Sequence, residues 1–283
     1  MAITPPILID APPPPPRPYG LFDVALGPMP FPMEQGISGG VQYIPDDCNG
    51  QSVYLYDLSC PAPSGSKTFD SIETAVSGSP FAVITSFICG SVGMNAEEVR
   101  TRVTTRMALR EQRAVERRLW QGQTLAQGQG AIQGLFRNAV NVGPASCVTD
   151  AVSLLEQALA DNGVVGGMIH ARPRMAPYVG QAHLYEYQGR RLQTCLGTPY
   201  VFGQGYDGSG PTGQAPDATT EWMYATGRVL IWQDEIQIPN LDQVFRRSTN
   251  ERIAIAERIY AALVECGVWT VQVTRTCATT GAT

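Results

Sequence analysis

Only two side chains in this 283-residue sequence are imidazoles, His170 and His183, and they are the first candidates for acid–base chemistry. His170 ends an apolar run, which is more typical of a buried core histidine than of a catalytic base. Ser209 follows Asp207-Gly208 and lacks the glycine two residues before it that a nucleophile elbow requires. The sequence also contains no Walker loop and no His-Glu-x-x-His motif. It therefore predicts no catalytic residue and no cofactor site.

The seven cysteines are scattered along the chain, at Cys48, Cys60, Cys89, Cys147, Cys195, Cys266 and Cys277. No Cys-x-x-Cys spacing exists, so the sequence predicts no zinc-knuckle or thioredoxin-like site and no metal site. An odd number of cysteines without a secretory signal favours reduced, mostly buried thiols, with a Cys48–Cys60 pair as the alternative. Nothing around Cys89 or Cys195 supports a thiol–histidine dyad.

Composition narrows the class of protein further. The formal net charge is −5, and only 16% of residues are charged against 43% hydrophobic. This balance excludes a basic protein that coats nucleic acid and leaves little charge for a free surface. No stretch approaches the roughly 18 apolar residues of a membrane span, and the start lacks a secretory signal. We expect a soluble protein made in a cytoplasm, with a structural or binding role rather than an enzymatic one.

Proline dominates the N-terminus. Eleven of the 22 prolines lie in the first 32 residues. The unbroken run is Pro12, Pro13, Pro14, Pro15 and Pro16, and Tyr19 follows it closely. Because proline fixes φ and has no N–H, residues 1–35 are predicted to be extended and partly polyproline-like. A compact N-terminal subdomain is excluded. The segment is either a free tail or SH3-type ligand, or an arm that lies on its own body or on a neighbour.

The elements that follow are β-rich and then helical. Residues 36–90 predict strands at 41–44 and 53–56 and a buried strand at 81–88. Residues 95–120 predict the longest helix, with Asn95 as N-cap and glutamates in its first turn. Its apolar stripe is thin, so we expect the helix to lie across a surface.

Arginines cover the rest of this helix, at Arg100, Arg102, Arg106, Arg110, Arg113, Arg117 and Arg118. We interpret the row Arg102, Arg106, Arg110, Arg113 and Arg117 as a solvated or salt-bridged face. Pairing with acidic groups of another subunit and contact with packaged nucleic acid are the alternatives.

The second half of the sequence alternates helix, strand and loop. We expect a glycine-rich bend over 122–134, a helix over 149–161 and an exposed loop over 203–220. The expected strands are at 164–170, 200–202, 228–232, 235–238 and 268–273. The secondary structure of residues 248–264 stays undecided. Ser248 and Glu251 match a capping box that would begin a helix, but the apolar residues fit either a helix or a strand period.

The order of these elements resembles the HK97-type major capsid proteins of tailed phages and the related encapsulins. In that family a spine helix ends in an acidic-apolar-glycine motif before a glycine turn, as Glu116-Arg117-Arg118-Leu119-Trp120-Gln121-Gly122 does ahead of Gly134-Leu135. The helix at 149–161 and residues 168–173 and 196–201 look like the family's A-domain helix and strands. Residues 225–229, 256–258 and 268–273 look like strands returning to the P-domain. The resemblance favours a strand over 252–264.

The resemblance implies an α+β, HK97-like capsid fold. Its parts would be an extended N-arm over 1–35, an E-loop-like region over 36–80, a P-domain over 81–146 with the spine helix at about 95–120, an A-domain over 147–235, and a return to the P-domain over 236–283. No protease or scaffold segment precedes the arm, which leaves open a processed form or a family member without a delta domain. Arginine and proline bias suggests a phage of a high-GC actinobacterium.

The implied function is a major capsid protein that forms the icosahedral head shell around a double-stranded DNA genome. Its implied partners are other copies, in pentamers and hexamers, and capsid, portal or decoration proteins, with non-specific proximity to the DNA and no membrane. Net negative charge would limit how tightly the shell holds DNA. The implied location is the virion, assembled in the host cytoplasm. Another virion structural protein (tail, connector or decoration) and an encapsulin-like cargo compartment are the alternatives.

Lys67 is the only lysine among 20 basic residues. Some family members form a Lys–Asn isopeptide bond between subunits from an E-loop lysine, and Lys67 falls in the corresponding region. We favour chance placement in a chain whose basic residues reflect a GC-rich genome, and keep the cross-link as a hypothesis.

Overall fold

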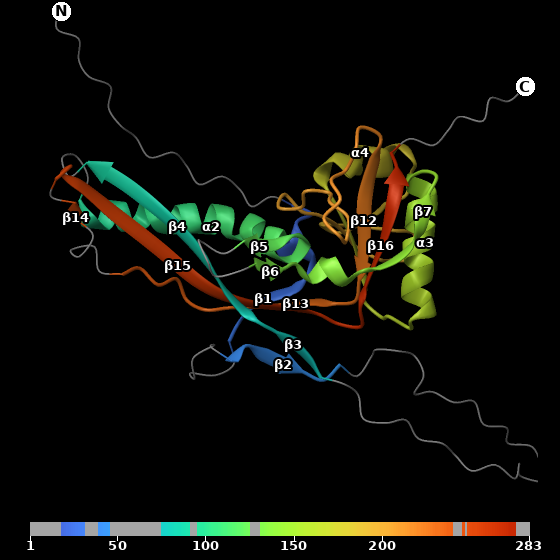
Figure 1. Ribbon diagram of the computed structural model, residues 1–283, viewed down its shortest axis with the longest axis horizontal. Helices are drawn as coiled ribbons and strands as arrows, with labels where there is room; N and C mark the ends of the chain where they lie inside the picture. Colours follow the sequence, from blue (N-terminus) through green and yellow to red (C-terminus); the bar gives the residue numbers. More distant parts are fainter. Residues whose placement is uncertain are drawn as a thin grey trace, which may run out of the picture.

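The computed structural model describes residues 18–31, 39–45, 75–90, 95–124, 131–239, 245–246 and 248–275. In these residues two five-stranded sheets form the body, and a long helix lies along the first of them (Figure 1). The first sheet and the long helix make up the elongated half of the body, and the second sheet and its helices make up the more compact half (Figure 1). The α+β class expected from the sequence is confirmed.

The long helix is α2 (Ala96–Trp120), which confirms the expected helix over 95–120. Asn95 caps it by accepting a hydrogen bond from the Glu98 N–H, and the Glu98 side chain accepts from the Asn95 N–H in return. Its buried apolar residues are Val99, Val103, Met107, Val115, Leu119 and Trp120. This stripe packs on β4 (Pro80–Gly90) and β15 (Glu251–Val264).

The first sheet runs in the order β1 (Leu26–Pro30), β13 (Val229–Gln233), β15, with β4 on the other edge of β15 and β14 (Phe245–Arg246) beside its start. β4 pairs with β15 along its whole length, from Pro80 opposite Ala261 to Gly90 opposite Glu251. This pairing decides the conformation that the periodicity of residues 248–264 left open. The segment is a strand from Glu251 to Val264, as the family resemblance favoured.

β4 corrects one expectation. The sequence suggested a buried strand at 81–88, but the side chains alternate between the α2 side and the solvent side. Ile84 and Ile88 point away from the helix and are 61% and 52% exposed. A run of apolar residues does not reveal which face of a strand is covered, because one face can be left for another molecule.

β2 (Val41–Tyr43) and β3 (Val76–Gly78) form an antiparallel pair on the sheet face opposite α2. Leu230 and Trp232 of β13 pack toward this pair, whereas Ile231 between them packs in the core beneath α2. The chain thus leaves the body along β2 and returns beside the same place along β3. Residues 46–74, with the expected strand at 53–56 and Lys67, lie outside the described residues.

Part of the proline-rich N-terminus belongs to the folded body. The short helix α1 (Leu21–Val24) buries Leu21 completely, and β1 pairs with β13 in parallel. The Tyr19 carbonyl accepts a hydrogen bond from the Phe202 N–H, 2.8 Å away. Residues 18–31 therefore lie on the chain's own body, which is one of the alternatives left open for the proline-rich segment, and only the turn and the short helix α1 depart from the extended conformation expected there. Pro12 to Pro16 lie outside the described residues.

The second sheet runs in the order β11 (Tyr200–Phe202), β8 (Met168–Ala171), β12 (Thr220–Thr226), β16 (Val268–Thr274), β7 (Val140–Ala145). Helix α3 (Val148–Asp161) packs across it, close to the expected 149–161, and α4 (Ala176–Gln181) packs on α3. The core between them is apolar and includes Leu155, Ile169 and Val271, all with no exposed surface.

The pairing corrects the expected domain boundaries. β16 lies inside the second sheet between β12 and β7, so residues 268–273 do not return to the first sheet. β7 belongs to the second sheet, although the expected P-domain range of 81–146 includes it. β13 belongs to the first sheet, although the expected A-domain range of 147–235 includes it. Local patterns do not show which partner a strand takes.

Two short connections join the sheets, between β12 and β13 and between β15 and β16. Arg228 on the first pairs with Glu265 on the second, 2.6 Å apart.

Small elements complete the described body. They are the hairpin β5 (Gly122–Thr124) and β6 (Ala131–Gln133), the 3₁₀ turns η2 (Leu135–Asn138) and η3 (Pro173–Met175), and the hairpin β9 (Glu186–Gln188) and β10 (Arg191–Gln193). The strand expected over 235–238 is wrong, because only Gln237 bridges to Glu257. Pro239 follows it and has no N–H with which to continue a ladder.

Two cysteines also differ from expectation. Cys147 and Cys266 are each disulfide-bonded, but not to one another, because the parallel pairing of β7 with β16 places them at opposite ends of these strands, whereas Cys89 and Cys195 are free. Reduced thiols were expected largely from the odd number of cysteines, and a count does not tell which sulfurs the fold brings together. None of the helices in the described part of the chain is long and apolar enough to cross a membrane.

Candidate assembly site

An aromatic cluster joins the two halves of the body at the end of α2. Trp120 has ring centroids 4.5 Å from both Tyr206 and Tyr224 and 5.5 Å from Phe136. The Trp120 indole N–H donates to the Ser209 carbonyl, 3.0 Å away. Because Trp120 ends the first half's helix while Tyr224 lies in the second sheet, this cluster fixes the angle between them.

His170 belongs to the same cluster and is a core residue, as the sequence predicted. It has no exposed surface, and its ring nitrogens lie 2.8 Å from the Tyr206 hydroxyl and 2.9 Å from Thr226 Oγ1. The Thr226 hydroxyl donates its proton to the Gly227 carbonyl, so it accepts from His170 Nε2–H. His170 Nδ1 then accepts from Tyr206, and burial lowers the pKa of the ring from 6.5 to about 3.

We expect the free energy of unfolding to fall as the pH drops from 6.5 toward 3, since only the unfolded chain then takes up this proton. The slope from this one group is at most about 1.4 kcal/mol per pH unit. Urea unfolding of the full chain across this range, with wild type compared with His170→Gln, isolates it. His183→Gln is the control, because His183 is exposed. Equal slopes for wild type and His170→Gln would contradict the assignment.

Glu116 is a buried carboxylate that holds three segments together. Glu116 Oε1 accepts from the Leu21 N–H at 3.1 Å and from Gln112 Nε2 at 2.9 Å, and Oε2 accepts from the Gly205 N–H at 2.8 Å. It has no exposed surface. Burial raises the pKa of Glu116, and these hydrogen bonds offset part of the rise. One side chain therefore ties the start of α1 and the loop after β11 to α2.

A second buried glutamate binds the helix to the first sheet. Glu111 Oε2 lies 3.0 Å from Arg258 Nη1 of β15, and both side chains are largely buried. Sequence reasoning did not single out Glu111. Its spacing could have revealed that Glu111 is buried, because it lies four residues after Met107 and four before Val115 on the buried stripe. An acidic residue on such a stripe needs a partner inside the fold.

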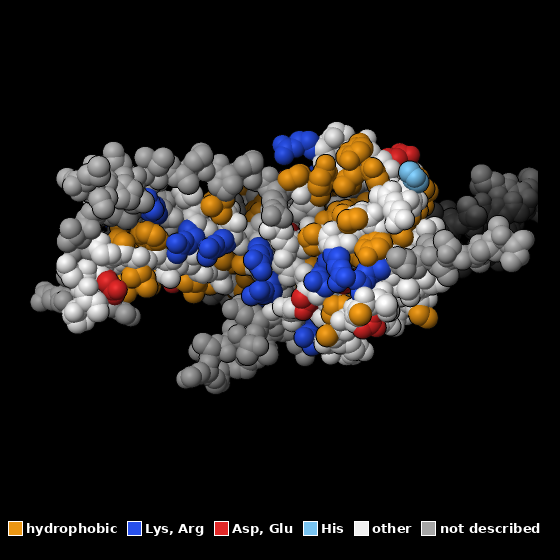
Figure 2. Space-filling view, turned by 90° about the horizontal axis from the view of Figure 1, so that it is seen from above, with side chains coloured by type: hydrophobic (Ala, Val, Ile, Leu, Met, Phe, Trp, Pro, Cys, Tyr) orange, Lys and Arg blue, Asp and Glu red, His pale blue; other side chains and the backbone are white. Residues whose placement is uncertain are grey.

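The predicted arginine row lies on α2 beside β4. Arg110, Arg113 and Arg117 are exposed, whereas Arg102 and Arg106 are half-buried. Arg106 donates to the Ser86 carbonyl at 2.7 Å, and its guanidinium lies 5.1 Å from the centre of the Phe87 ring. Figure 2 shows basic side chains in a line along the elongated half of this face, with few acidic ones near them.

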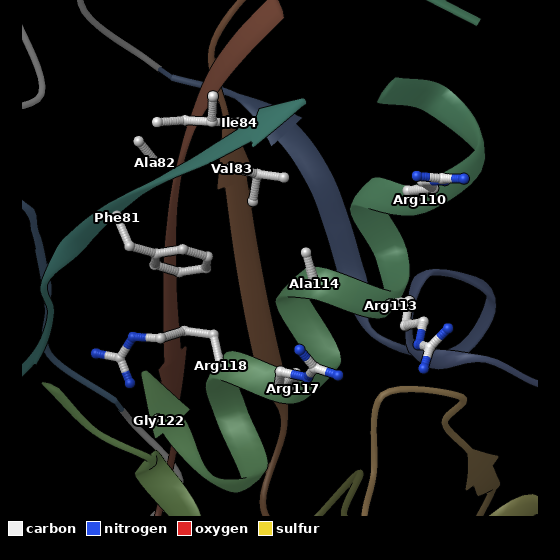
Figure 3. A pocket seen from close by; sticks show the side chains of 10 residues that line it. All are labelled: Phe81, Ala82, Val83, Ile84, Arg110, Arg113, Ala114, Arg117, Arg118 and Gly122. Atoms are coloured by element: carbon white, nitrogen blue, oxygen red, sulfur yellow. The ribbon is translucent and has the colours of Figure 1, made fainter. Parts of the chain in front are cut away.

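A groove of about 580 Å³ separates this helix from β4. Arg110, Arg113 and Arg117 line one wall and residues 81–84 the other, as Figure 3 shows. Arg118 departs from the solvated interpretation, because it is buried with its guanidinium 5.5 Å from the centre of the Phe81 ring. A second groove, of about 710 Å³, continues along the helix past Arg102 and Arg106.

The opposite face of the first sheet is apolar. Side chains directly opposite on antiparallel strands point the same way, so Ile84 and Ile88 share their face with Glu257 and Ile253 of β15. Ile259 on this face is 36% exposed. Exposed isoleucines grouped on one sheet face, such as Ile84, Ile88 and Ile259, are uncommon on a protein that functions as a monomer. This face, which points away from α2, is therefore suited to contact with another protein surface. Among the described residues, no three His, Cys, Asp or Glu side chains gather as a metal site would require.

Comparison with known proteins supports a fold assignment. No family profile and no curated protein matches the sequence. Solved structures do match. The capsid of an empty GTA particle matches with a TM-score of 0.57 and 12% identity over 90% of each chain. A structure from Microbacterium phage Oxtober96 gives 0.53 and 10% over 95% of each, and the capsid of Ralstonia phage GP4 gives 0.53 and 10% over 92% of each.

These matches establish the fold. The chain has the HK97-like capsid fold, and the match covers at least 90% of its length. The fold expected from the sequence resemblance is confirmed, at identities of 10–12%.

Proposed function

We propose that this chain is the major capsid protein of a tailed bacteriophage and that its copies assemble into the icosahedral head shell around a double-stranded DNA genome. The observation that carries the proposal is the HK97-like fold across at least 90% of the chain, shared with the capsid of an empty GTA particle and the capsid of Ralstonia phage GP4. The chain has no enzymatic role in this proposal. It acts in the virion and assembles in the host cytoplasm.

Two features of the body support self-assembly. The outer face of β4 and β15 presents Ile84, Ile88 and Ile259 with nothing in the described chain to cover them fully. The pair β2–β3 begins and ends the E-loop-like region expected from the sequence, and we propose this region as a second contact with a neighbouring copy. Both are heterologous contacts, which close into pentamers and hexamers when repeated by rotation. Portal and decoration proteins and the packaged DNA are the further partners, and Lys67 remains a candidate cross-link in the E-loop-like region.

Negative-stain microscopy of the purified full-length protein tests this function. Closed icosahedral shells support it, whereas rings or tubes indicate a tail or connector protein. Small discrete oligomers overturn it. For shells, the contents decide between a virus head and a cargo compartment, because co-purified protein cargo in place of DNA indicates an encapsulin-like role.

Removing residues 1–17 tests the proline-rich arm. We expect the truncated chain to fold, because Leu21 and β1 keep their places in the core, but to form shells that dissociate at lower denaturant concentration. Polyproline segments lose little conformational freedom on docking, so an arm of this kind stabilises contacts efficiently. Circular dichroism reports folding and light scattering reports shell integrity. Removing residues 1–30 is the control and should prevent folding. Shells of normal stability after the shorter deletion would rule out an intersubunit arm.

A further inference from the structure

The five arginines of the row on α2 keep to one side of the helix. Their positions, at 102, 106, 110, 113 and 117, advance in steps of four, four, three and four residues. With 3.6 residues per turn, these steps confine the row to a sector of about 80° and extend it over about 22 Å. The row is therefore a straight line of positive charge rather than a band around the helix.

Between Arg106 and Arg117 no carboxylate of the helix offsets the row on its exposed side. Glu111 and Glu116 point inward, where they bind Arg258 and backbone N–H groups respectively. Glu97 and Glu98 lie in the first turn and line the second groove with Arg102 and Arg106, so acidic neighbours occur only at the N-terminal end of the row. Among the described residues, Arg110, Arg113 and Arg117 are exposed and make no ion pair within 4.0 Å. The net charge of −5 thus conceals a strongly segregated distribution.

The surroundings of the row favour a polyanion over a protein partner. Between Arg110 and Arg117 the only exposed side chain is Arg113, and no apolar side chain is exposed there. The central parts of protein–protein interfaces are depleted in charge and are anchored by apolar and aromatic groups. Apolar groups border the row, since Ile84 lines the groove and Leu109 is exposed beside Arg110, but they do not interrupt it between Arg110 and Arg117. A line of guanidinium groups above a groove matches the phosphates of a duplex.

We infer that the arginine row of α2 is the surface through which this protein contacts the phosphate backbone of duplex DNA. The inference rests on the proposed function and adds to it a defined contact surface. It also places α2 on the side of the shell that faces the genome, with the isoleucine face and the pair β2–β3 on the other side. Binding is independent of base sequence, because the row offers only guanidinium groups to phosphates.

The test compares two variants of equal charge. R110Q/R113Q/R117Q removes three arginines from the row, and R174Q/R190Q/R191Q removes three exposed arginines from the second half of the molecule. Each unassembled full-length chain is titrated into a labelled duplex of about 20 base pairs, roughly 70 Å long, between about 50 and 200 mM salt. Fluorescence anisotropy gives the affinity, and negative stain shows whether each variant still forms shells.

For the row variant we expect the slope of log affinity against log salt to become shallower by about 2.7, since each lost phosphate contact removes about 0.9. The second variant should bind like wild type. Equal losses in both variants, or no binding by wild type, would overturn the inference. Unchanged DNA binding by the row variant together with failure to assemble would overturn it in favour of an acidic protein partner. Shell formation by wild type tests the proposed function separately, whatever the duplex does.

Discussion

Replacing Glu116 with leucine should lower the free energy of unfolding by about 2–6 kcal/mol, because two buried backbone N–H groups lose their acceptor and each unsatisfied donor costs about 1–3 kcal/mol. Those donors belong to Leu21 and Gly205, so the change loosens the start of α1 and the loop after β11 at once. Gly205 has no room for adjustment, as a Cβ there would lie 2.3 Å from the Arg113 carbonyl oxygen. Urea unfolding of the full-length chain measures the loss.

Two further variants keep this prediction specific. Glu116→Gln retains one oxygen but turns an NH₂ group toward an N–H donor, so we expect a loss between wild type and Glu116→Leu. Glu97→Leu, on an exposed position of the same helix, should cost no more than about 1 kcal/mol through its effect on the helix dipole. If Glu116→Leu unfolds at the same urea concentration as Glu97→Leu, the carboxylate does not hold the three segments.

Trp120→Ala should destabilise the chain by about 3–5 kcal/mol, the usual cost of removing a large aromatic side chain from a packed core. Trp120 is 2% exposed and contacts Phe136, Tyr206 and Tyr224, so the cavity falls where the two halves meet. We expect shells of this variant to be irregular as well as less stable. Thermal unfolding and negative-stain microscopy measure the two effects.

Trp120→Phe is the matched control for that cavity. It keeps an aromatic ring in the cluster but loses the indole N–H and part of the ring volume, and the Ser209 carbonyl still accepts from the Tyr224 hydroxyl at 2.9 Å. Its cost should therefore be well below that of alanine. Equal losses for phenylalanine and alanine would mean that the hydrogen bond, and not the packing of the ring, stabilises the junction.

Local features of the sequence predicted the parts of this fold that depend on local interactions. Asn95 with Glu98 predicted the start of α2, and the four-residue spacing of Val99, Val103 and Met107 predicted its buried side. His170 was recognisable as a core residue because it ends an apolar run. These predictions need only the neighbours within a turn of helix or a few strand residues.

Features that depend on partners distant in the chain could not be predicted from local sequence patterns. The conformation of residues 251–264 follows from pairing with β4, more than 160 positions earlier, and β16 joined the second sheet because β12 and β7 flank it. Glu116 gained its role from Leu21 and Gly205, which no spacing connects to it. Arg118 looked like its exposed neighbours until Phe81 was placed beside it.

The two connections between the sheets have a mechanical consequence. They run side by side, with the Glu265 N–H bonded to the Arg228 carbonyl and the two side chains paired, so one sheet cannot twist on the other without breaking both. Bending toward α2 is opposed by the filled aromatic junction. Together these contacts oppose relative movement of the two halves of the body. In the proposed shell, copies at five-fold and six-fold positions meet at different curvatures. We expect this difference to be accommodated by the contacts between copies, and not by a change of shape within each copy.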